Sequence, residues 1–388
     1  MNHGVEIIVV GGGVFGAAGA LELQRRGHRV SVVDRGQLPH PAASSTDISK
    51  AIRMDYGADA FYTRAMEHAL RGWRAWNEER EQPLFHETGF LWLSHREMKT
   101  GTFEGDSYAV LRQRGHNPQR LRPEKLKERF PAWTEGGYRD GYFIPRAGWA
   151  EAGRVVSHLL DACREAGVRV LEKGTVSSLL EENGRVDGVE TTQGALEADV
   201  VVLAAGAWTP QLLPELADRV WPVGQPVFHL QVPEPARFQP PGFVPWGSDI
   251  ARTGWYGFPA RENGTLKIAN HGPGQRMPPT SHAEVTPRQE QALRDFLAEN
   301  LPAAAEARLL EARLCFYADS WDGDFYIDRI PDRPGLVIAT GGSGHAFKFA
   351  PLLGDWIADA VEGRENPALQ RFRWREKGER RTEHARHT

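Results

Sequence analysis

The chain has 388 residues, of which 40% are hydrophobic and 25% charged, and its formal net charge is −4. This composition is that of a water-soluble globular protein, and the length favours two domains over a single core. So small a net charge gives no overall field to recruit nucleic acid or an anionic membrane, and no apolar run approaches the ~20 residues of a membrane span. Two cysteines, Cys163 and Cys315, are too few for a disulfide framework or a structural zinc site and indicate a reducing compartment.

The N-terminal stretch predicts a compact strand–helix–strand unit. It has no basic region ahead of its short apolar run, so we expect no export signal and a cytoplasmic protein. Residues 5–10 (VEIIVV) are a β-branched apolar run typical of a buried parallel strand. The next residues have helical spacing as far as Gly27, and residues 28–36 predict a second strand that ends on Asp34.

Three glycines lie between this first strand and the helix in the pattern Gly11-x-Gly13-x-x-Gly16. Gly11 permits a tight turn, Gly13 lets the backbone approach a pyrophosphate, and Gly16 lets helix and strand pack closely, while a phosphate would lie at the helix N-terminus. Asp34 lies at the distance expected for an acid that accepts hydrogen bonds from a ribose. A lone glycine pattern is often only a turn, but strand, glycines, helix and acid together favour a dinucleotide site. The motif by itself does not distinguish FAD from NAD.

Residues 44–57 (SSTDISKAIRMDYG) follow the second strand and carry Lys50 and Arg53. Two cations three residues apart share one face if the segment forms a helical turn. Charge content alone favours a solvated loop instead.

The middle of the chain predicts two helices and several strands. Residues 60–82 and 150–166 have apolar residues at three- and four-residue steps, as amphipathic helices do. Cys163 lies near the apolar face of the second helix, where we expect a packed small hydrophobe. Residues 89–94 predict a strand, and residues 167–208 predict strands separated by tight glycine turns, with a hairpin at an Asn-Gly pair.

Residues 216–280 predict mixed strands and loops that are rich in proline, glycine and aromatic residues. Within them, residues 256–272 predict two strands around an Asn-Gly turn, and Lys267, Ala269 and His271 alternate onto one face of the second strand. A lysine beside a reacting centre stabilises developing negative charge. The pattern alone favours a different interpretation, in which the lysine and the histidine are exposed on an edge strand.

The C-terminal third predicts a helix at 286–301, which starts at a Thr-Pro pair, and a final strand–turn–helix. The turn of this last unit, residues 341–351 (GGSGHAFKFAP), could direct backbone amides at a ligand, with Lys348 about one turn into the helix; an ordinary surface lysine is the alternative. Residues 373–388 are polar and basic without an apolar face, so we expect a solvated or frayed end.

These motifs, taken with Cys315 in the stretch ARLCFYADSWDGDFYIDR (312–329), resemble the monomeric sarcosine oxidase family of flavoprotein amine oxidases, within the D-amino-acid-oxidase-like superfamily. The resemblance covers residues 5–363. It implies an α/β (α+β) fold with a Rossmann-like FAD-binding domain and a second, mixed-sheet substrate domain. The implied boundaries are 1–88, 146–215 and 320–388 for the FAD-binding domain, and 89–145 and 216–319 for the substrate domain.

The resemblance also implies the roles of individual residues. FAD would be attached covalently to Cys315 through the flavin 8-methyl group, and Lys267 would activate O2. Arg53 and Lys348 would bind the substrate carboxylate, and Tyr256 and His271 would line the substrate pocket. Lys50 is a further candidate catalytic residue. The residues expected to bind the cofactor are Gly11, Gly13, Val14, Phe15, Gly16, Asp34, Arg35, Ser45, Thr46, Val176, Ala205, Gly206, Trp208, Cys315, Gly342, Gly344, His345, Phe347 and Lys348.

The expected activity is therefore oxidation of a secondary amine, an N-methyl or N-alkyl amino acid, by a monomeric oxidase that uses O2, releases hydrogen peroxide and needs no metal. Some segments point to a different substrate. The TDISK segment and residues 322–328 and 339–349 look more like the fructosyl amino acid oxidases, whereas His271 stands where those enzymes tend to carry glutamate, and Ala346 replaces a usual glycine. A fructosyl amino acid oxidase, a flavin amine dehydrogenase with another electron acceptor and a non-catalytic FAD-binding protein remain the alternatives.

Overall fold

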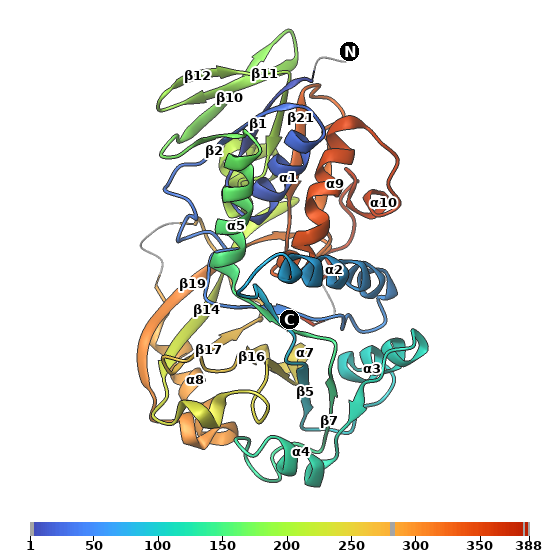
Figure 1. Ribbon diagram of the computed structural model, residues 1–388, viewed down its shortest axis with the longest axis vertical. Helices are drawn as coiled ribbons and strands as arrows, with labels where there is room; N and C mark the ends of the chain where they lie inside the picture. The colour runs from blue at the N-terminus through green and yellow to red at the C-terminus, as the bar shows by residue number, and fades with distance from the viewer. Residues whose placement is uncertain (1–3, 280–283, 383–384, 387–388) are drawn as a thin grey trace.

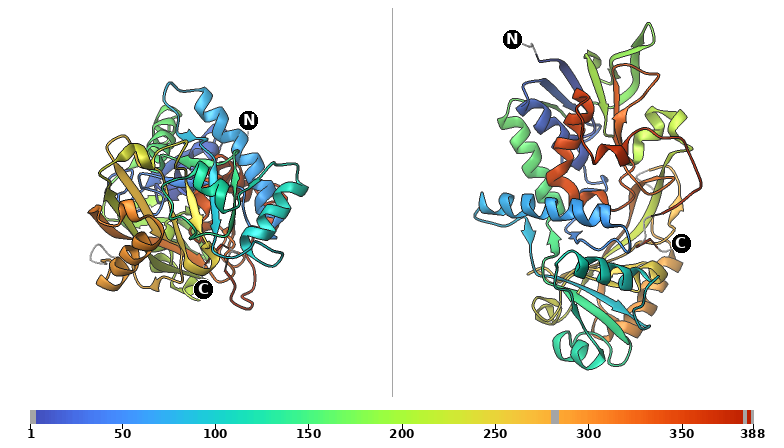
Figure 2. Two further views of the ribbon diagram at one scale, coloured as in Figure 1. Left: turned by 90° about the horizontal axis from the view of Figure 1, so that it is seen from below. Right: turned by 90° about the vertical axis from the view of Figure 1, so that its right-hand side faces the viewer.

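The computed structural model describes residues 4–279, 284–382 and 385–386. Its elements form two lobes, one around a six-stranded sheet and the other around a nine-stranded sheet (Figure 1). Helix α2 (Ala60–Glu78) crosses between the lobes (Figures 1 and 2) and buries Tyr62, Met66 and Trp73 along one side. The steps of four and seven residues between these side chains are those of an amphipathic helix, as predicted.

The first lobe is a Rossmann-like layer structure. Its sheet has the order β20-β21-β13-β1-β2-β9, in which β20 alone is antiparallel to its neighbour. The strands are β1 (Glu6–Val10), β2 (Arg29–Val33), β9 (Arg169–Leu171), β13 (Val200–Leu203), β20 (Tyr326–Arg329) and β21 (Leu336–Thr340). Three helices cover one face, with α1 (Val14–Arg25) in contact with both α5 (Ala152–Glu165) and α9 (Ala350–Glu362). A three-stranded sheet of β10 (Val176–Glu182), β11 (Arg185–Thr191) and β12 (Gly194–Glu197) covers the other face through β11 and β13.

The second lobe is built on long antiparallel strands. Strand β14 (Val220–Gln231) pairs with β19 (Arg308–Ser320) on one edge and with β17 (Thr265–Asn270) on the other. The sheet continues through β16 (Trp255–Gly257), β15 (Trp246–Ser248), β5 (Phe90–Ser94), β7 (Asp140–Ile144) and β6 (Gln119–Arg120), and β18 (Gln275–Arg276) pairs with β14. Helix α8 (Pro287–Asn300) packs on this lobe and starts with a capping box at Thr286. The shorter helices α3 (Phe103–Gln113), α4 (Pro123–Arg129) and α7 (Ile250–Thr253) complete it.

The α/β fold class and its division into a Rossmann-like part and a mixed-sheet part are therefore confirmed. The predicted helices at 60–82, 150–166 and 286–301 and the Asn-Gly hairpin are present, the last with φ of +53° at Asn183 and +76° at Gly184. None of the described helices combines the length and the apolarity that crossing a bilayer requires.

Two local expectations need correction. Residues Lys50–Ile52 form the strand β3, neither the solvated loop that charge content favours nor a helical turn, and pair with β8 (Gly148–Ala150), which in turn pairs with β4 (Phe85–His86). The tail, residues 373–388, follows α10 (Leu369–Phe372) and is exposed at residues 376–381, as expected of a solvated end. It is not solvated throughout the part that the structure describes, because Arg386 is buried and forms an ion pair with Asp319. A local pattern showed neither feature, because both depend on partners far away in the chain.

Candidate active site

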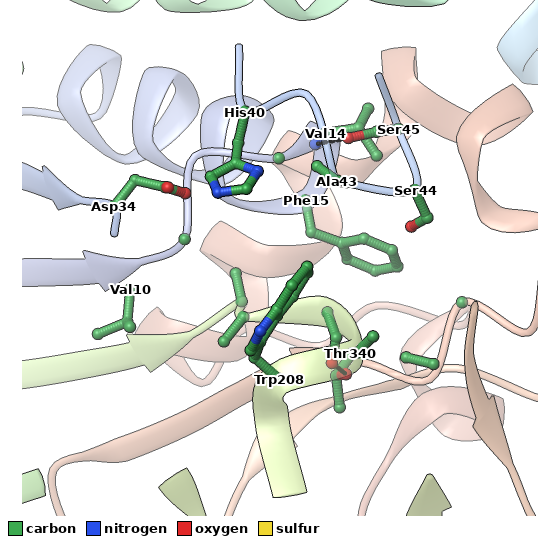
Figure 3. A pocket seen from close by; sticks show the side chains of 18 of the residues that line it. Val10, Val14, Phe15, Asp34, His40, Ala43, Ser44, Ser45, Trp208 and Thr340 are labelled. Carbon is green, nitrogen blue, oxygen red and sulfur yellow. Dashed lines mark hydrogen bonds between the residues drawn. The ribbon is translucent and has the colours of Figure 1, made fainter. Parts of the chain in front are cut away.

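A cleft with about 1260 Å³ of empty space, partly open to solvent, runs along the carboxyl ends of the parallel strands (Figure 3). Strand β1, the first turn of α1 and the ends of β2, β13 and β21 all contribute to it. Ligands of open α/β sheets bind at this edge. Fourteen of the residues expected to bind the cofactor line it: Gly11, Gly13, Val14, Phe15, Asp34, Arg35, Ser45, Val176, Ala205, Gly206, Trp208, Gly342, Gly344 and Phe347.

The glycine turn has the close packing that a dinucleotide site needs. Gly11 has φ of +104°, which only glycine adopts readily. A Cβ on Gly16 would lie 1.8 Å from the Gly11 carbonyl oxygen, so the strand and helix approach as closely as glycine allows. Helix α1 starts at Gly13 without a side-chain cap and without an acidic residue in its first turn. Its positive end therefore faces the cleft and fits an anionic pyrophosphate.

Asp34 lies at the end of β2 and points into the cleft (Figure 3). Its carboxylate accepts hydrogen bonds from the backbone N–H groups of Gly12, at 2.8 Å, and Gly36, at 3.0 Å. Each carboxylate oxygen keeps acceptor capacity for a ribose hydroxyl. On another wall, the buried Trp208 indole nitrogen has no hydrogen-bond partner among the described residues, and the Arg35 guanidinium lies 5.4 Å from the ring centroid. These features fit the adenosine half of FAD.

A second cavity, with about 580 Å³ of empty space, adjoins this cleft, and Lys50, Tyr317, Gly344 and Phe347 line both. The residues expected to bind or surround the substrate come together here: Lys50, Arg53, Tyr256, His271 and Lys348, with His345. The walls are largely aromatic and apolar, from Phe90, Trp92, Ile250, Phe258, Tyr317 and Phe347. A small molecule bound in this cavity would therefore lie next to a ligand bound at the adjoining end of the cleft.

The two cations expected to bind a carboxylate are held firmly in this cavity. Arg53 is buried, donates a hydrogen bond to the Asp55 carbonyl oxygen, and lies 5.1 Å from the Tyr56 ring centroid. The Lys348 Nζ atom donates to the His345 carbonyl oxygen at 2.8 Å and to the Tyr56 hydroxyl at 3.1 Å. Among the described residues that line the cavity there is no carboxylate side chain. Three cationic side chains, Lys50, Arg53 and Lys348, thus line the cavity, which suits an anionic group of a ligand.

Lys267 lines neither cavity but lies in a buried charge cluster beside them. Its Nζ atom is 2.8 Å from an Asp47 carboxylate oxygen and donates to the Ser49 carbonyl oxygen at 2.6 Å. Arg313 and His229 contact the same carboxylate, at 2.8 and 3.2 Å. Burial lowers the pKa of Lys267 to about 8, although Asp47 counteracts it. Burial would raise the pKa of Asp47, but Lys267 and the hydrogen bond from His229 hold it well below its usual range.

Cys315 is buried on β19, beside residues that line the cavities. Its Sγ atom lies 3.9 Å from the Lys50 Nζ atom and 3.9 Å from the Ser44 carbonyl oxygen. It lines neither cavity itself, but Ser44 lines the cleft, and Lys50 and Tyr317 line both spaces. Cys163, by contrast, packs between α5 and α1 with its thiol directed at the Ala17 carbonyl oxygen, and burial raises its pKa to about 12.

Some residues differ from the sequence-based expectation. Gly16 acts in packing, and Thr46 lies beside the cleft without lining it, with its hydroxyl buried and unpartnered among the described residues. Tyr317 was missed, although it is two residues beyond Cys315 on a strand and so shares its face, a signal that alternation offers. Nothing in the sequence indicated that Asp47 pairs with Lys267, because that contact joins two lobes.

Comparisons with known proteins agree with this site. Residues 6–360 match the sequence profile of the family described as FAD dependent oxidoreductase. An N-methyl-L-tryptophan oxidase from Salmonella heidelberg is 30% identical over 365 residues, which cover 92% of this chain and 95% of that protein. The solved structure of the fructosyl amine:oxygen oxidoreductase Amadoriase I from Aspergillus fumigatus has a TM-score of 0.81 at 26% identity and covers 97% of this chain and 90% of that one. A glycine oxidase from Geobacillus kaustophilus shares the fold, with a TM-score of 0.81 at 24% identity over 97% of this chain and 100% of that one.

Proposed function

Since the chain belongs to the FAD dependent oxidoreductase family, we propose that it is an FAD-dependent oxidase of secondary amines whose substrates are N-alkyl amino acids. The observation that carries this proposal is the second cavity, in which Arg53 and Lys348 line a largely aromatic and apolar space that adjoins the cleft.

The cations of the cavity have two tasks in this proposal. Arg53 presents a planar fork and Lys348 a point charge, and together they bind the substrate carboxylate. Their positive field also lowers the pKa of the bound ammonium group, so that the amine loses its proton and becomes the neutral form that can be oxidised. The aromatic walls exclude water and hold the reacting C–H bond in place, which supplies part of the rate.

FAD, when bound, would supply the redox chemistry: the substrate would lose a hydride equivalent from the carbon next to the nitrogen, and O2 would be the final acceptor of the two electrons, which with two protons gives hydrogen peroxide. The imine product adds water and separates into an aldehyde and an amine. Lys267 supplies positive charge near the place where O2 gains electrons, and Asp47 holds that ammonium group in position.

We further propose that Cys315 carries the FAD through a thioether to the flavin 8-methyl group. The C–S bond replaces one S–H and one C–H bond, a two-electron oxidation for which O2 is the acceptor. Supporting this are the position of Cys315 on β19 beside residues that line both cavities and the Lys50 ammonium group 3.9 Å from its Sγ atom.

The lining of the cavity also bears on the substrate. Among the described lining residues there is no Asp, Glu, Asn, Gln, Ser or Thr side chain. A sugar carries several hydroxyls that each need a partner when buried, whereas an apolar or aromatic side chain fits these walls directly. The alternative, a fructosyl amino acid oxidase, is supported by the similarity to Amadoriase I.

A side-by-side assay tests the proposal. Peroxide formation is measured with N-methylglycine, N-methyltryptophan and fructosyl-glycine under one set of conditions. We expect turnover of the N-methyl amino acids with much lower activity on the sugar amine. Preference for fructosyl-glycine would establish the alternative, and flavin bleaching by an amine with slow reoxidation in air would indicate a dehydrogenase.

A further inference from the structure

The C-terminal strap, residues 364–386 as far as they are described, is fastened to the acidic stretch 319–328 by arginine–aspartate pairs. Arg371 contacts Asp324 at 2.8 Å, Arg375 contacts both oxygens of Asp322 at 2.6 Å, and Arg386 contacts both oxygens of Asp319 at 2.9 and 2.7 Å. Two parallel hydrogen bonds from one guanidinium to one carboxylate are the strong form of this pair. The basic tail and the acidic stretch that looked unrelated in the sequence are therefore partners.

The last of these pairs lies against the wall of the substrate cavity. Arg386 is buried, with 6% of its surface exposed, and its Nε atom donates to the Gly272 carbonyl oxygen at 2.8 Å. Its guanidinium carbon lies 5.5 Å from the centroid of the Tyr317 ring. Gly272 follows His271 directly, and both His271 and Tyr317 line the cavity. One side chain from the strap thus holds the backbone behind one lining residue and the ring of another.

Burial of the Arg386 guanidinium lowers stability unless its charge and its hydrogen-bond donors all have partners. A buried arginine needs a paired charge and filled donors, and removing one partner of such a pair leaves the other uncompensated. Asp319 is itself buried, with 6% of its surface exposed. Chain ends that lack such anchors fray. A second hydrogen bond fixes the turn after His271, because the Gln225 amide also donates to the Gly272 carbonyl oxygen, at 2.7 Å. Loss of Arg386 should therefore increase the mobility of this turn without unfolding it.

We propose that Arg386 is a positioning residue of the substrate cavity, which sets the separation of His271 and Tyr317 and thereby the affinity for the substrate. The ring centroids of these two lie 5.8 Å apart. The predicted effect on substrate affinity rests on the proposed amine oxidase function. The predicted effect on the position of the turn after His271 and of the Tyr317 ring does not.

Arg375 provides a matched control on the same strap. It forms the same kind of two-bond pair with a buried aspartate, and its guanidinium carbon lies 3.9 Å from the Tyr326 ring centroid. Neither Arg375, Asp322 nor Tyr326 is among the residues that line the two cavities. Arg375→Ala therefore costs stability of the strap but leaves the cavity wall in place.

The experiment compares Arg386→Ala, Arg386→Lys and Arg375→Ala in the FAD-loaded protein. Hydrogen exchange is followed in the segments 268–274 and 315–320 without substrate, and KM and kcat are measured separately with an N-methyl amino acid. For Arg386→Ala we expect exchange in both segments and KM to rise at least about tenfold, with kcat changed much less, as for a misplaced binding wall. Arg386→Lys, which keeps the charge but loses the fork, should recover part of both effects.

The proposal is overturned if Arg386→Ala matches Arg375→Ala in exchange and in KM, since the strap would then serve stability alone. If Arg386→Ala does not fold, Asp319→Asn, which keeps the shape of the partner and removes its charge, decides by the same two measurements. If the wild-type protein oxidises no amine, the proposed function fails and hydrogen exchange alone decides the role of Arg386.

Discussion

Replacing Asp47 with asparagine would remove the negative charge that the side chains of Lys267, Arg313 and His229 contact. The Asp47 side chain is fully buried. Asparagine has nearly the same shape, so the perturbation is electrostatic. We expect a protein that folds but is less stable, with a loss that grows as the pH falls.

The pH window follows from Lys267. Its pKa is about 8 in the folded protein against the ordinary 10.5, so the unfolded chain binds this proton more tightly, and wild-type stability rises between about pH 8 and 10.5. Loss of a carboxylate 2.8 Å away removes up to about 6 kcal/mol of attraction at an effective dielectric of about 20. The pKa of Lys267 then falls well below 8. Each unit of that fall costs about 1.4 kcal/mol in the acidic range.

For a fall of about two units, the extra loss caused by Lys267 is about 2.7 kcal/mol below pH 6 and vanishes above about pH 9, where the lysine is neutral in both folded proteins. Arg313 stays charged throughout and adds a loss that does not depend on pH. Urea unfolding of wild-type and Asp47→Asn proteins, followed by tryptophan fluorescence between pH 6 and 9, measures both parts. In the double variant Asp47→Asn/Lys267→Met the pH-dependent part should disappear. Equal losses for the single variant at pH 6 and pH 9 would refute this assignment of charge.

Three further predictions concern the cofactor and the substrate. Cys315→Ser should release its yellow colour on acid precipitation, whereas the wild-type protein should keep it; release from both would contradict the thioether. Arg53→Met and Lys348→Met should each raise KM for an N-methyl amino acid by about 10²-fold, as expected for the loss of a charge-assisted pair of about 3 kcal/mol. KM for an amine without a carboxylate should stay nearly unchanged. Equal effects on both amines would exclude carboxylate binding. Gly16→Ala places a Cβ 1.8 Å from the Gly11 carbonyl oxygen, so strand and helix must separate, and the ratio of FAD to protein should fall sharply; full FAD content would show that this close approach is not required.

The sequence by itself determined the Rossmann-like part of the fold. The apolar run of β1, the three glycines and Asp34 lie within 34 residues, and local periodicity and turn chemistry suffice to predict strand, turn and helix there. The resemblance, which depends on residues far apart in the chain, added the site residues. Fourteen of the residues expected to bind the cofactor line the cleft, and Lys50, Arg53, Tyr256, His271, His345 and Lys348 line the second cavity.

Only the tertiary structure decided how charges are paired. Lys50 and Arg53 line one cavity, although they lie on and just after the strand β3, whose position is fixed by its pairing with β8, about a hundred residues later in the chain. Asp47 and Lys267 meet across the two lobes, and Arg386 reaches Asp319 from the end of the described chain. A short stretch of sequence around a charged residue predicts that the residue is exposed to solvent. Such a residue can be buried only when it has a partner of opposite charge, and that partner often lies elsewhere in the chain.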